Sequence, residues 1–433
     1  MSETRPAGVL SLAVPALGTL AAEPLYVLID TAVVGHLGAV QLGGLGVAGA
    51  LMSQVAGQCN FLAYGTTGRA ARRYGAGHRE EAVGEGVQAT WLALGIGVLI
   101  LIAGQLVAGP AAGLLAGDND AVRRAAVHWL RIALFGAPFI LLSLAGNGWM
   151  RGVHEARKPF LFVLIGNGLS AVLCPTLVYG AGMGLAGSAV ANVVAQSSTG
   201  VLFLRALRTQ GVSLRPDPAV MRAQLVVARD LVVRTLGMQI CFLSATSVAA
   251  RMGTAQVAAH QVALQLWTFL SLALDAFAIA AQSLVGAALG SGDERRARSL
   301  ARTVSWYGAA AGLFFGAVLM AGWSVLPGLF TSDGPVVHQA HIAWPWLAGM
   351  QPLAGIVFAL DGVLIGAGDV GFLRTLTVAV ALLGFLPMTL IAYFAGLGLG
   401  GVWAGLTLFI VLRLIGMVWR TAGGRWARIG ATA

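Results

Sequence analysis

The sequence predicts an all-α polytopic membrane protein, with 12 transmembrane helices in two pseudo-symmetric six-helix lobes. Three observations predict this fold class: the apolar composition, apolar segments of membrane-spanning length, and an internal duplication. Of the 433 residues, 58% are hydrophobic and only 10% are charged, whereas soluble domains carry about 25% charged residues. The composition therefore excludes an ordinary soluble domain.

Twelve apolar segments, separated by charged residues or by glycine and proline, are each long enough to cross a bilayer, which takes about 20 helical residues. In chain order, we expect membrane helices at 8–36, 40–67, 83–109, 124–151, 158–180, 185–207, 223–250, 256–288, 299–328, 337–366, 371–394 and 399–420. Within the ninth segment, Gly308, Gly312 and Gly316 recur every four residues. This spacing predicts a face on which two membrane helices approach closely.

The basic residues predict how the chain is oriented. With a cytoplasmic N-terminus, all but four of the 27 lysines and arginines fall in the inner loops and helix ends; the exceptions are Arg123, Arg124, Arg131 and Arg251. Because cytoplasmic loops are enriched in Lys and Arg, we expect both termini in the cytoplasm and a multi-pass protein of the plasma membrane, the inner membrane of a bacterium. The net charge of +10 has the same explanation, so no nucleic-acid partner is expected.

The second half of the chain repeats the first. The register that aligns Thr31 with Thr246 also lays YGAGHREEA, residues 74–82, over LGSGDERRA, residues 289–297. After a shift of one residue, YGAGMGLAG from residue 179 lies over YFAGLGLGG from residue 393. Similarity over most of both halves indicates a duplication.

The duplication predicts the domain organisation. Each half has six spans, and an even number gives both halves the same orientation, so an axis along the membrane normal should relate them. We predict an N-terminal lobe at 1–208, a polar cytoplasmic linker at 209–222 and a C-terminal lobe at 223–433. Two equivalent lobes with a cavity between them suit transport by alternating access.

Four acidic residues lie within the predicted spans, where a carboxylate costs roughly 2.5–3.5 kcal/mol. They are Glu23, Asp30, Asp275 and Asp361. The repeat aligns Asp30 with Ala245, Asp275 with Asn60 and Asp361 with Asn147, so the lobes differ in charge. Packing alone does not require this asymmetry, and each acid is either a hydrogen-bonded structural group or a functional one.

Several segments carry a resemblance to one family. PLYVLIDTAVVGHLG, residues 24–38, resembles the first-helix motif of the DinF branch of the multidrug and toxic compound extrusion (MATE) family. RGVHEARKP (151–159) and ALDGVLIGAGD (359–369) resemble the family's loops after the fourth and tenth helices. RTLGMQICF (234–242) and AAHQVALQL (258–266) fit the same branch, and the resemblance covers essentially the whole chain.

The resemblance implies a cation-coupled antiporter that exports organic, often cationic, compounds in exchange for protons or sodium. It also implies a role for Asp30, since the family couples transport through its first-helix acid. An ionised carboxylate can hold a cation, and a protonated one can lie in a drier helix arrangement. Glu23 lies on the same helix face and is a candidate second acid, although about 10 Å of helix separates the two.

The fifth helix departs from the pattern of this branch, Asn-x-x-Asn-x-x-x-Asp. NGLSAVLC keeps Asn167, but Ser170 replaces the second Asn and Cys174 replaces the Asp. In the family, that Asp helps to form a polar, sodium-capable pocket beside the first-helix acid. Sodium prefers oxygen ligands, so a neutral thiol predicts a weakened sodium site. We expect coupling to H+, with Na+ less suited; the expected coupling residues are Asp30, Glu23, Asn167, Ser170 and Cys174.

A second set of polar and aromatic residues is a candidate lining for a substrate cavity. Tyr26 can contact an organic cation through its ring face. His260, beside Gln261, either forms a helix–helix hydrogen bond or contacts substrate. The whole predicted set is Tyr26, Asn60, Asn147, His260, Gln261, Asp275 and Asp361.

Two other function classes compete with a multidrug exporter. A lipid-linked sugar flippase, or a dedicated metabolite exporter of the same superfamily, is the alternative; a flippase needs several arginines for pyrophosphate, and only Arg131, Arg234 and Arg251 lie near membrane depth. A membrane enzyme is disfavoured because the sequence has no P-loop, HExxH or GxSxG motif. We expect a monomeric, non-enzymatic transporter of small organic substrates in the lipid bilayer, with no resident cofactor and no metal.

Overall fold

The fold is helical throughout the described part of the chain. The structure, a computed structural model, describes residues 6–432, and these contain helices and turns but no β-strand. Twelve helical segments among them are long and apolar enough to cross a membrane. The predicted all-α, twelve-span fold class is therefore confirmed.

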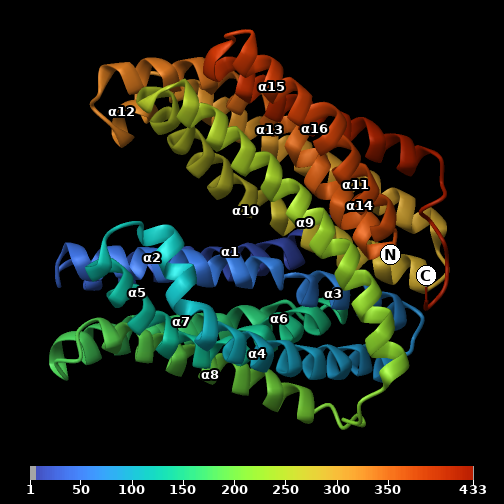
Figure 1. The fold of residues 1–433 in the computed structure, drawn as a ribbon. Coiled ribbons are helices and arrows are strands. Elements are labelled where there is room, and N and C mark those ends of the chain that lie inside the picture. Colours follow the sequence, from blue (N-terminus) through green and yellow to red (C-terminus); the bar gives the residue numbers. More distant parts are fainter. Residues whose placement is uncertain (1–5, 433) are drawn as a thin grey trace. The chain divides into compact units, whose positions relative to one another are not determined.

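The helices follow one another through short connections (Figure 1). Their bounds are α1 Pro6–Gly35, α2 Ala39–Gln58, α3 Phe61–Gly75, α4 Arg79–Ala116, α5 Asp120–Ala133, η1 Leu134–Gly136, α6 Ala137–Gly152, α7 Arg157–Pro175, η2 Thr176–Gly180, α8 Leu185–Arg208, α9 Pro218–Met252, α10 Thr254–Gly290, α11 Glu294–Ala321, α12 Leu326–Phe330, α13 Gly334–Gly366, α14 Val370–Val380, η3 Ala381–Phe385, α15 Leu386–Phe394 and α16 Gly398–Ala422.

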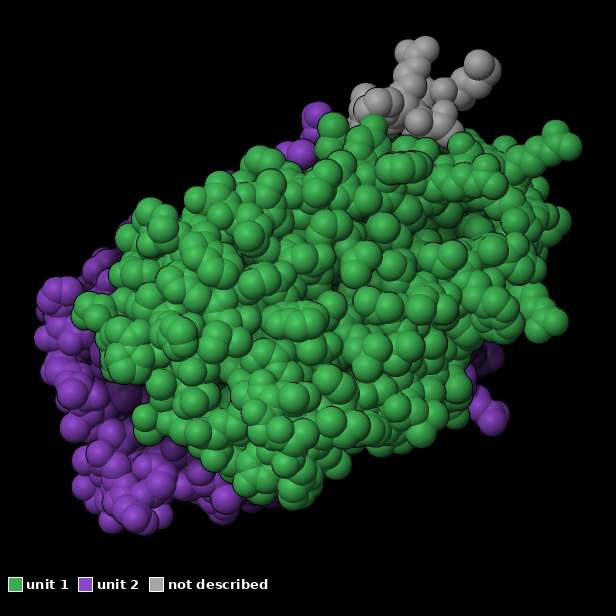
Figure 2. All heavy atoms as spheres, turned by 90° about the horizontal axis from the view of Figure 1, so that it is seen from above, with its two compact units in different colours: residues 1–13, 229–433 green, residues 14–228 purple. Residues whose placement is uncertain are grey.

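The contacts divide the chain into two compact units, which Figure 2 colours separately. Among the described residues, the N-terminal unit comprises residues 14–228, and the C-terminal unit comprises residues 229–432 together with residues 6–13. The boundary falls within α9, whose first turns belong to the N-terminal unit. The assignment of 1–208 and 223–433 as two functional lobes stays a prediction.

Several of the spans are interrupted, and the predicted ends of the second, third and ninth spans differ from the observed helix ends by seven or eight residues. The fourth span contains the 3₁₀ turn η1 just before Pro138, and the fifth and eleventh contain the π-helical turns η2 and η3. The sequence predicts a ninth span that reaches residue 328, but α11 ends at Ala321 and the separate short helix α12 follows. Pro327, in the first turn of α12, has no backbone N–H with which to continue α11.

The glycine spacing of the ninth span does mark a packing face. Gly308, Gly312 and Gly316 are buried on α11 against α13. A Cβ atom at Gly308 would lie 2.2 Å from the carbonyl oxygen of Gly355, and one at Gly312 would lie 2.2 Å from that of Gln351. Only glycine permits so close an approach of two helix backbones, and the predicted face is confirmed.

The duplication is also visible in backbone geometry. Gly38 and Gly253, which the repeat aligns, each precede a membrane helix with a φ of 125° and 143°, respectively. Gly77 and Gly292 are likewise paired, with φ values of 85° and 78°. Residues other than glycine rarely adopt a positive φ. The two halves of the repeat therefore have the same backbone turns at equivalent positions.

Candidate functional site

The predicted coupling acid lies on the buried face of α1. Tyr26 and Asp30 are one helical turn apart and are 6% and 4% exposed, whereas Val27, Leu28 and Ile29 between them are exposed. The α-helical period places residues four apart on one face. The apolar side chains thus cover the outward face of α1, and the polar ones point into the N-terminal unit.

Neutral donors from two other helices hold the Asp30 carboxyl group. The hydroxyl of Ser188, on α8, donates to Asp30 Oδ1 over 2.6 Å, and the thiol of Cys174, on α7, donates to the same oxygen over 3.1 Å. Ser188 Oγ in turn accepts a 3.0 Å hydrogen bond from the indole Nε1 of Trp129, on α5. The carboxyl group therefore sits in a buried, hydrogen-bonded cage with no basic side chain among its described hydrogen-bond partners.

Tyrosines tie α1 to the same two helices. The Tyr26 hydroxyl accepts a 3.3 Å hydrogen bond from Asn192 Nδ2, on α8, and the Tyr26 side chain also interacts with Asp30. The Tyr179 hydroxyl, in η2, donates to the backbone carbonyl of Val33. These bonds fix the helix segment that carries Asp30 relative to α7 and α8.

Of the three residues predicted on the fifth helix, Cys174 makes direct contact with Asp30. Ser170 is buried, and its side chain interacts with that of Tyr26, although its hydroxyl forms no hydrogen bond of standard geometry with a described atom. The Asn167 side-chain nitrogen is likewise buried and unpartnered within the described chain. Glu23 is exposed, unlike Asp30, so the structure does not bring these two acids together.

Sequence reasoning missed Ser188, Trp129 and Asn192. A signal for Ser188 was present, because the repeat register that aligns Gly187 with Gly401 aligns Ser188 with Val402. This is the same kind of asymmetry as Asp30 against Ala245. No sequence signal marks Trp129, since its role depends on the three-dimensional approach of α5 to α8.

Asp361, in the C-terminal unit, has entirely different neighbours. Arg413 Nη2, from α16, lies 2.9 and 2.7 Å from its two carboxylate oxygens, and Arg234 Nη2, from α9, lies 2.6 Å from Oδ2. The Asp361 and Arg413 side chains are only 6% and 1% exposed. Arg413, counted among the inner-surface cations in the sequence, is instead buried within α16, where it neutralises an acid of the neighbouring helix α13.

The other predicted cavity residues are dispersed. His260 is completely buried, its Nε2 lies 3.1 Å from Thr246 Oγ1 of α9, and its ring packs on Trp403; this geometry fits the helix–helix hydrogen bond. Asn147 donates to the Ser143 carbonyl of its own helix over 2.8 Å.

The remaining members lie as follows: Asn60 is half-buried between α2 and α3, Gln261 is exposed on α10, and Asp275 is half-buried on α10 with an interaction partner. Their contact with substrate stays a prediction.

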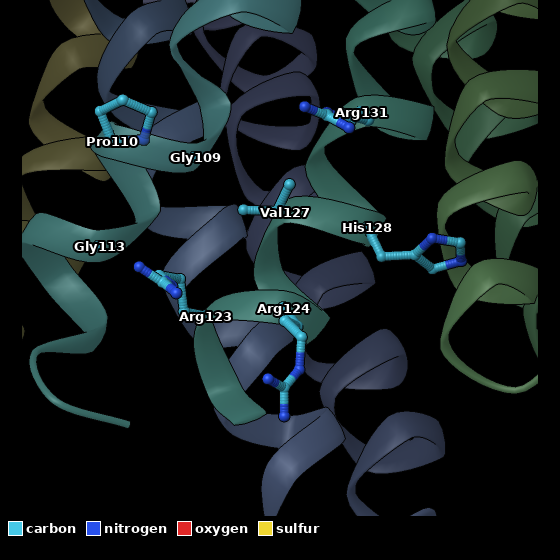
Figure 3. A pocket seen from close by; sticks show the side chains of 8 residues that line it. All are labelled: Gly109, Pro110, Gly113, Arg123, Arg124, Val127, His128 and Arg131. Atoms are coloured by element: carbon cyan, nitrogen blue, oxygen red, sulfur yellow. The ribbon is translucent and has the colours of Figure 1, made fainter. Parts of the chain in front are cut away.

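A cavity of about 600 Å³ lies elsewhere in the N-terminal unit, between α4 and α5 (Figure 3). Arg123 and Arg131 extend from α5 towards α4, whereas His128 points to the opposite side. Arg124 also lines this space, which contains no acidic lining residue. The basic lining makes this cavity unsuited to an organic cation, and Asp30 does not line the cavity.

Comparison with known proteins places the chain in a family. The family model described as MatE matches residues 15–176 and again residues 231–391, in the register of the internal repeat. The chain is 34% identical to Protein DETOXIFICATION 44, chloroplastic, of Arabidopsis thaliana, over 96% of this chain and 83% of that protein. It is 33% identical to DNA damage-inducible protein F of Escherichia coli K12, over 96% and 92%.

Solved structures agree in fold. A MOP superfamily transporter from Pyrococcus furiosus matches with a TM-score of 0.87 at 23% identity, over 96% of this chain and 95% of that one. A crystal structure of MATE in the bent conformation matches with a TM-score of 0.88 at 24% identity, over the same shares. Because the family model and relatives of more than 30% identity match most of its length, the chain belongs to the multidrug and toxic compound extrusion (MATE) family and is a membrane transporter, not an enzyme.

Proposed function

We propose that this transporter exports organic, often cationic, compounds in exchange for protons, and that the Asp30 carboxyl group takes up and releases the coupled proton. The observation that carries the proposal is the set of Asp30 contacts. A buried acid bonded only to neutral donors can change its charge without breaking an ion pair. Asp361 is the contrasting case, because two arginines bind its ionised form.

The donors around Asp30 favour a proton over sodium. Sodium is a hard cation that needs several oxygen ligands, and one of the two side chains that donate to Asp30 Oδ1 is the Cys174 thiol, a sulfur ligand. The Ser188 hydroxyl directs its proton towards Asp30, an orientation that serves an anion and not a metal ion. We therefore propose H+ as the transported coupling ion and no resident cofactor.

The alternative, a lipid-linked sugar flippase, needs arginines that are free to bind pyrophosphate, and the described contacts do not favour this. Of the arginines at membrane depth, Arg234 and Arg413 are both bound to Asp361, which leaves less positive charge for a pyrophosphate. The comparison with relatives named for detoxification or for multidrug resistance favours the exporter. We further propose a bacterial inner-membrane location, cytoplasmic termini and a monomeric transporter.

Liposomes containing the purified protein test the choice of ion. We expect an imposed pH gradient to drive export of fluorescent organic cations, and a sodium gradient at equal pH on both sides to drive little. Cys174→Asp restores an oxygen ligand beside Asp30 and should raise the response to sodium. Cys241→Asp is not a suitable control, because that position lies near Arg413; Cys59→Ser, in the same unit, controls for loss of a buried thiol.

Two results would contradict this proposal. Export by the wild type that follows sodium with no pH gradient would overturn the choice of proton. Export of anionic lipid-linked sugars with no transport of organic cations would favour the flippase.

A further inference from the structure

A chain of buried hydrogen bonds ends on Asp30. It runs from the Trp129 indole nitrogen to Ser188 Oγ over 3.0 Å, and from the Ser188 hydroxyl to Asp30 Oδ1 over 2.6 Å. The three groups come from α5, α8 and α1. Trp129 is 4% exposed and Ser188 is completely buried, so water does not compete with either bond.

The chemistry of the three groups fixes the direction of these hydrogen bonds. An indole N–H can only donate, so Ser188 Oγ must accept from it. A serine hydroxyl has a single proton, and Asp30, when ionised, can only accept. Trp129 therefore holds the hydroxyl in the orientation that presents its proton to the carboxylate. Hydrogen bonds from donors stabilise the charged form of a carboxyl group.

The duplicated half of the sequence shows what packing alone requires at these positions. The repeat register places Ala245 opposite Asp30 and Val402 opposite Ser188. Val402 is fully buried in α16, just as Ser188 is buried in α8. An apolar residue therefore satisfies the packing of the equivalent helix, and the hydroxyl occurs in the half of the chain that has the carboxyl group.

We propose that Trp129 and Ser188 are positioning residues that set the pH range over which Asp30 exchanges its proton. This inference rests on the proposed coupling role of Asp30 and adds a device that tunes it. With both hydrogen bonds intact, the donors stabilise the ionised carboxylate of Asp30 relative to the protonated acid. Without them, this stabilisation is lost.

Other ionisable groups around Asp30 are few. Tyr26, on the same helix, and Cys174, on α7, face the carboxyl group directly. The basic residues of α5, among them His128 and Arg131, are exposed and line the separate cavity of Figure 3, and Asp120 is exposed at the start of α5. Ser188 and Asn192, the contacts contributed by α8, are uncharged. Substitutions at Trp129 and Ser188 leave Tyr26, Cys174 and these charges unchanged.

The test is an infrared titration of the full-length protein in lipid. The carbonyl stretching band of a protonated carboxylic acid is followed against pH, and the part that disappears in Asp30→Asn is assigned to Asp30. We expect Ser188→Ala to move the midpoint upwards by about one pH unit, since loss of a hydrogen bond to a charged group is worth about that much. Ser188→Thr keeps the hydroxyl and should keep the wild-type midpoint.

Trp129→Phe keeps an aromatic ring but loses the donor, and it should move the midpoint in the same direction by a smaller amount. Because Trp129 acts through Ser188, adding Trp129→Phe to Ser188→Ala should cause no further shift. If Ser188→Ala does not fold, Trp129→Phe alone carries the test. Matched controls are Ser143→Ala, whose hydroxyl bonds to the Phe139 carbonyl, and Trp344→Phe, whose indole bonds to the Leu319 carbonyl; both should leave the midpoint unchanged.

The outcomes separate this inference from the proposed function. Wild-type midpoints in both Ser188→Ala and Trp129→Phe would overturn the inference while leaving proton coupling through Asp30 intact. Equal shifts in the two control variants would also overturn it, because the effect would then be a general consequence of altered packing. If Asp30→Asn still transports against a gradient when driven by protons, the proposed function itself fails.

Discussion

At the residue scale, two acids that are buried to a similar extent differ in the groups that surround them. Asp30 is bonded to a hydroxyl and a thiol, while Asp361 is bonded to two guanidinium groups. Removing one member of a buried ion pair leaves an uncompensated charge, which costs about 3–5 kcal/mol. Removing a charge that has no opposite charge beside it carries no such penalty. The two sites therefore predict opposite consequences for the same substitution.

Asp361→Asn should destabilise the protein strongly, because Arg234 and Arg413 would keep their buried positive charges. Asp30→Asn, the matched control, retains an amide that can accept from Ser188, so its stability should stay near that of the wild type. Thermal unfolding of both variants in detergent measures the difference. An Asp361→Asn protein with the wild-type melting temperature would contradict the structural role given to that ion pair.

The sequence predicted Asp30 and Cys174 as neighbours only through resemblance to a family, and the structure places them in contact. The sequence could not predict that Asp361 would pair with Arg413. Arg413 lies on α16 two turns before Arg420, and in the sequence it is grouped with the basic residues of the inner helix ends. The sequence did not single out Ser188, because serine is common in apolar helices and its hydroxyl often donates to a backbone carbonyl of its own helix. Only the approach of α8 to α1 distinguishes it.

At the element scale, helix packing depends on where glycines meet a neighbouring backbone. Gly312 of α11 faces the Gln351 carbonyl of α13, whereas Gly349 of α13 faces open space. The two glycines differ in tertiary contact but share a helical conformation. Hydropathy predicted all twelve spans, yet it did not mark the break between α11 and α12, where no charged residue occurs. The residues that disfavour a continuous helix there are Gly322, Pro327 and Gly328.

Gly312→Ala should lower stability by about 1–3 kcal/mol, because its methyl group would overlap a backbone carbonyl and force α11 and α13 apart. Gly349→Ala should raise stability slightly, by up to about 1 kcal/mol, since alanine favours the helix more than glycine does. Apparent melting temperatures in one detergent compare the two. A stabilising effect of Gly312→Ala would show that α11 and α13 do not approach this closely.

At the scale of the whole molecule, the duplication makes each half carry the same turns, and the basic residues predict one orientation for both. His78 lies in the exposed turn before α4, Arg295 is exposed in the first turn of the repeat-related helix α11, and Asp118 lies in the exposed turn between α4 and α5. Cysteines introduced at His78 and Arg295 should react with a membrane-impermeant reagent only from the cytoplasm, and one at Asp118 only from outside. The native Cys59, Cys174 and Cys241 are buried. Cytoplasmic labelling at Asp118 would reverse the proposed topology.

Proton coupling through Asp30 is tested by gradient-driven export in liposomes of Asp30→Asn, measured alongside binding of the same fluorescent cation in detergent. The variant keeps the shape of the side chain but cannot gain or lose a proton. We predict a folded protein that still binds substrate and has lost export driven by a pH gradient. If Asp30→Asn instead exports as fast as the wild type under that gradient, Asp30 does not carry the coupled proton and has a structural role only.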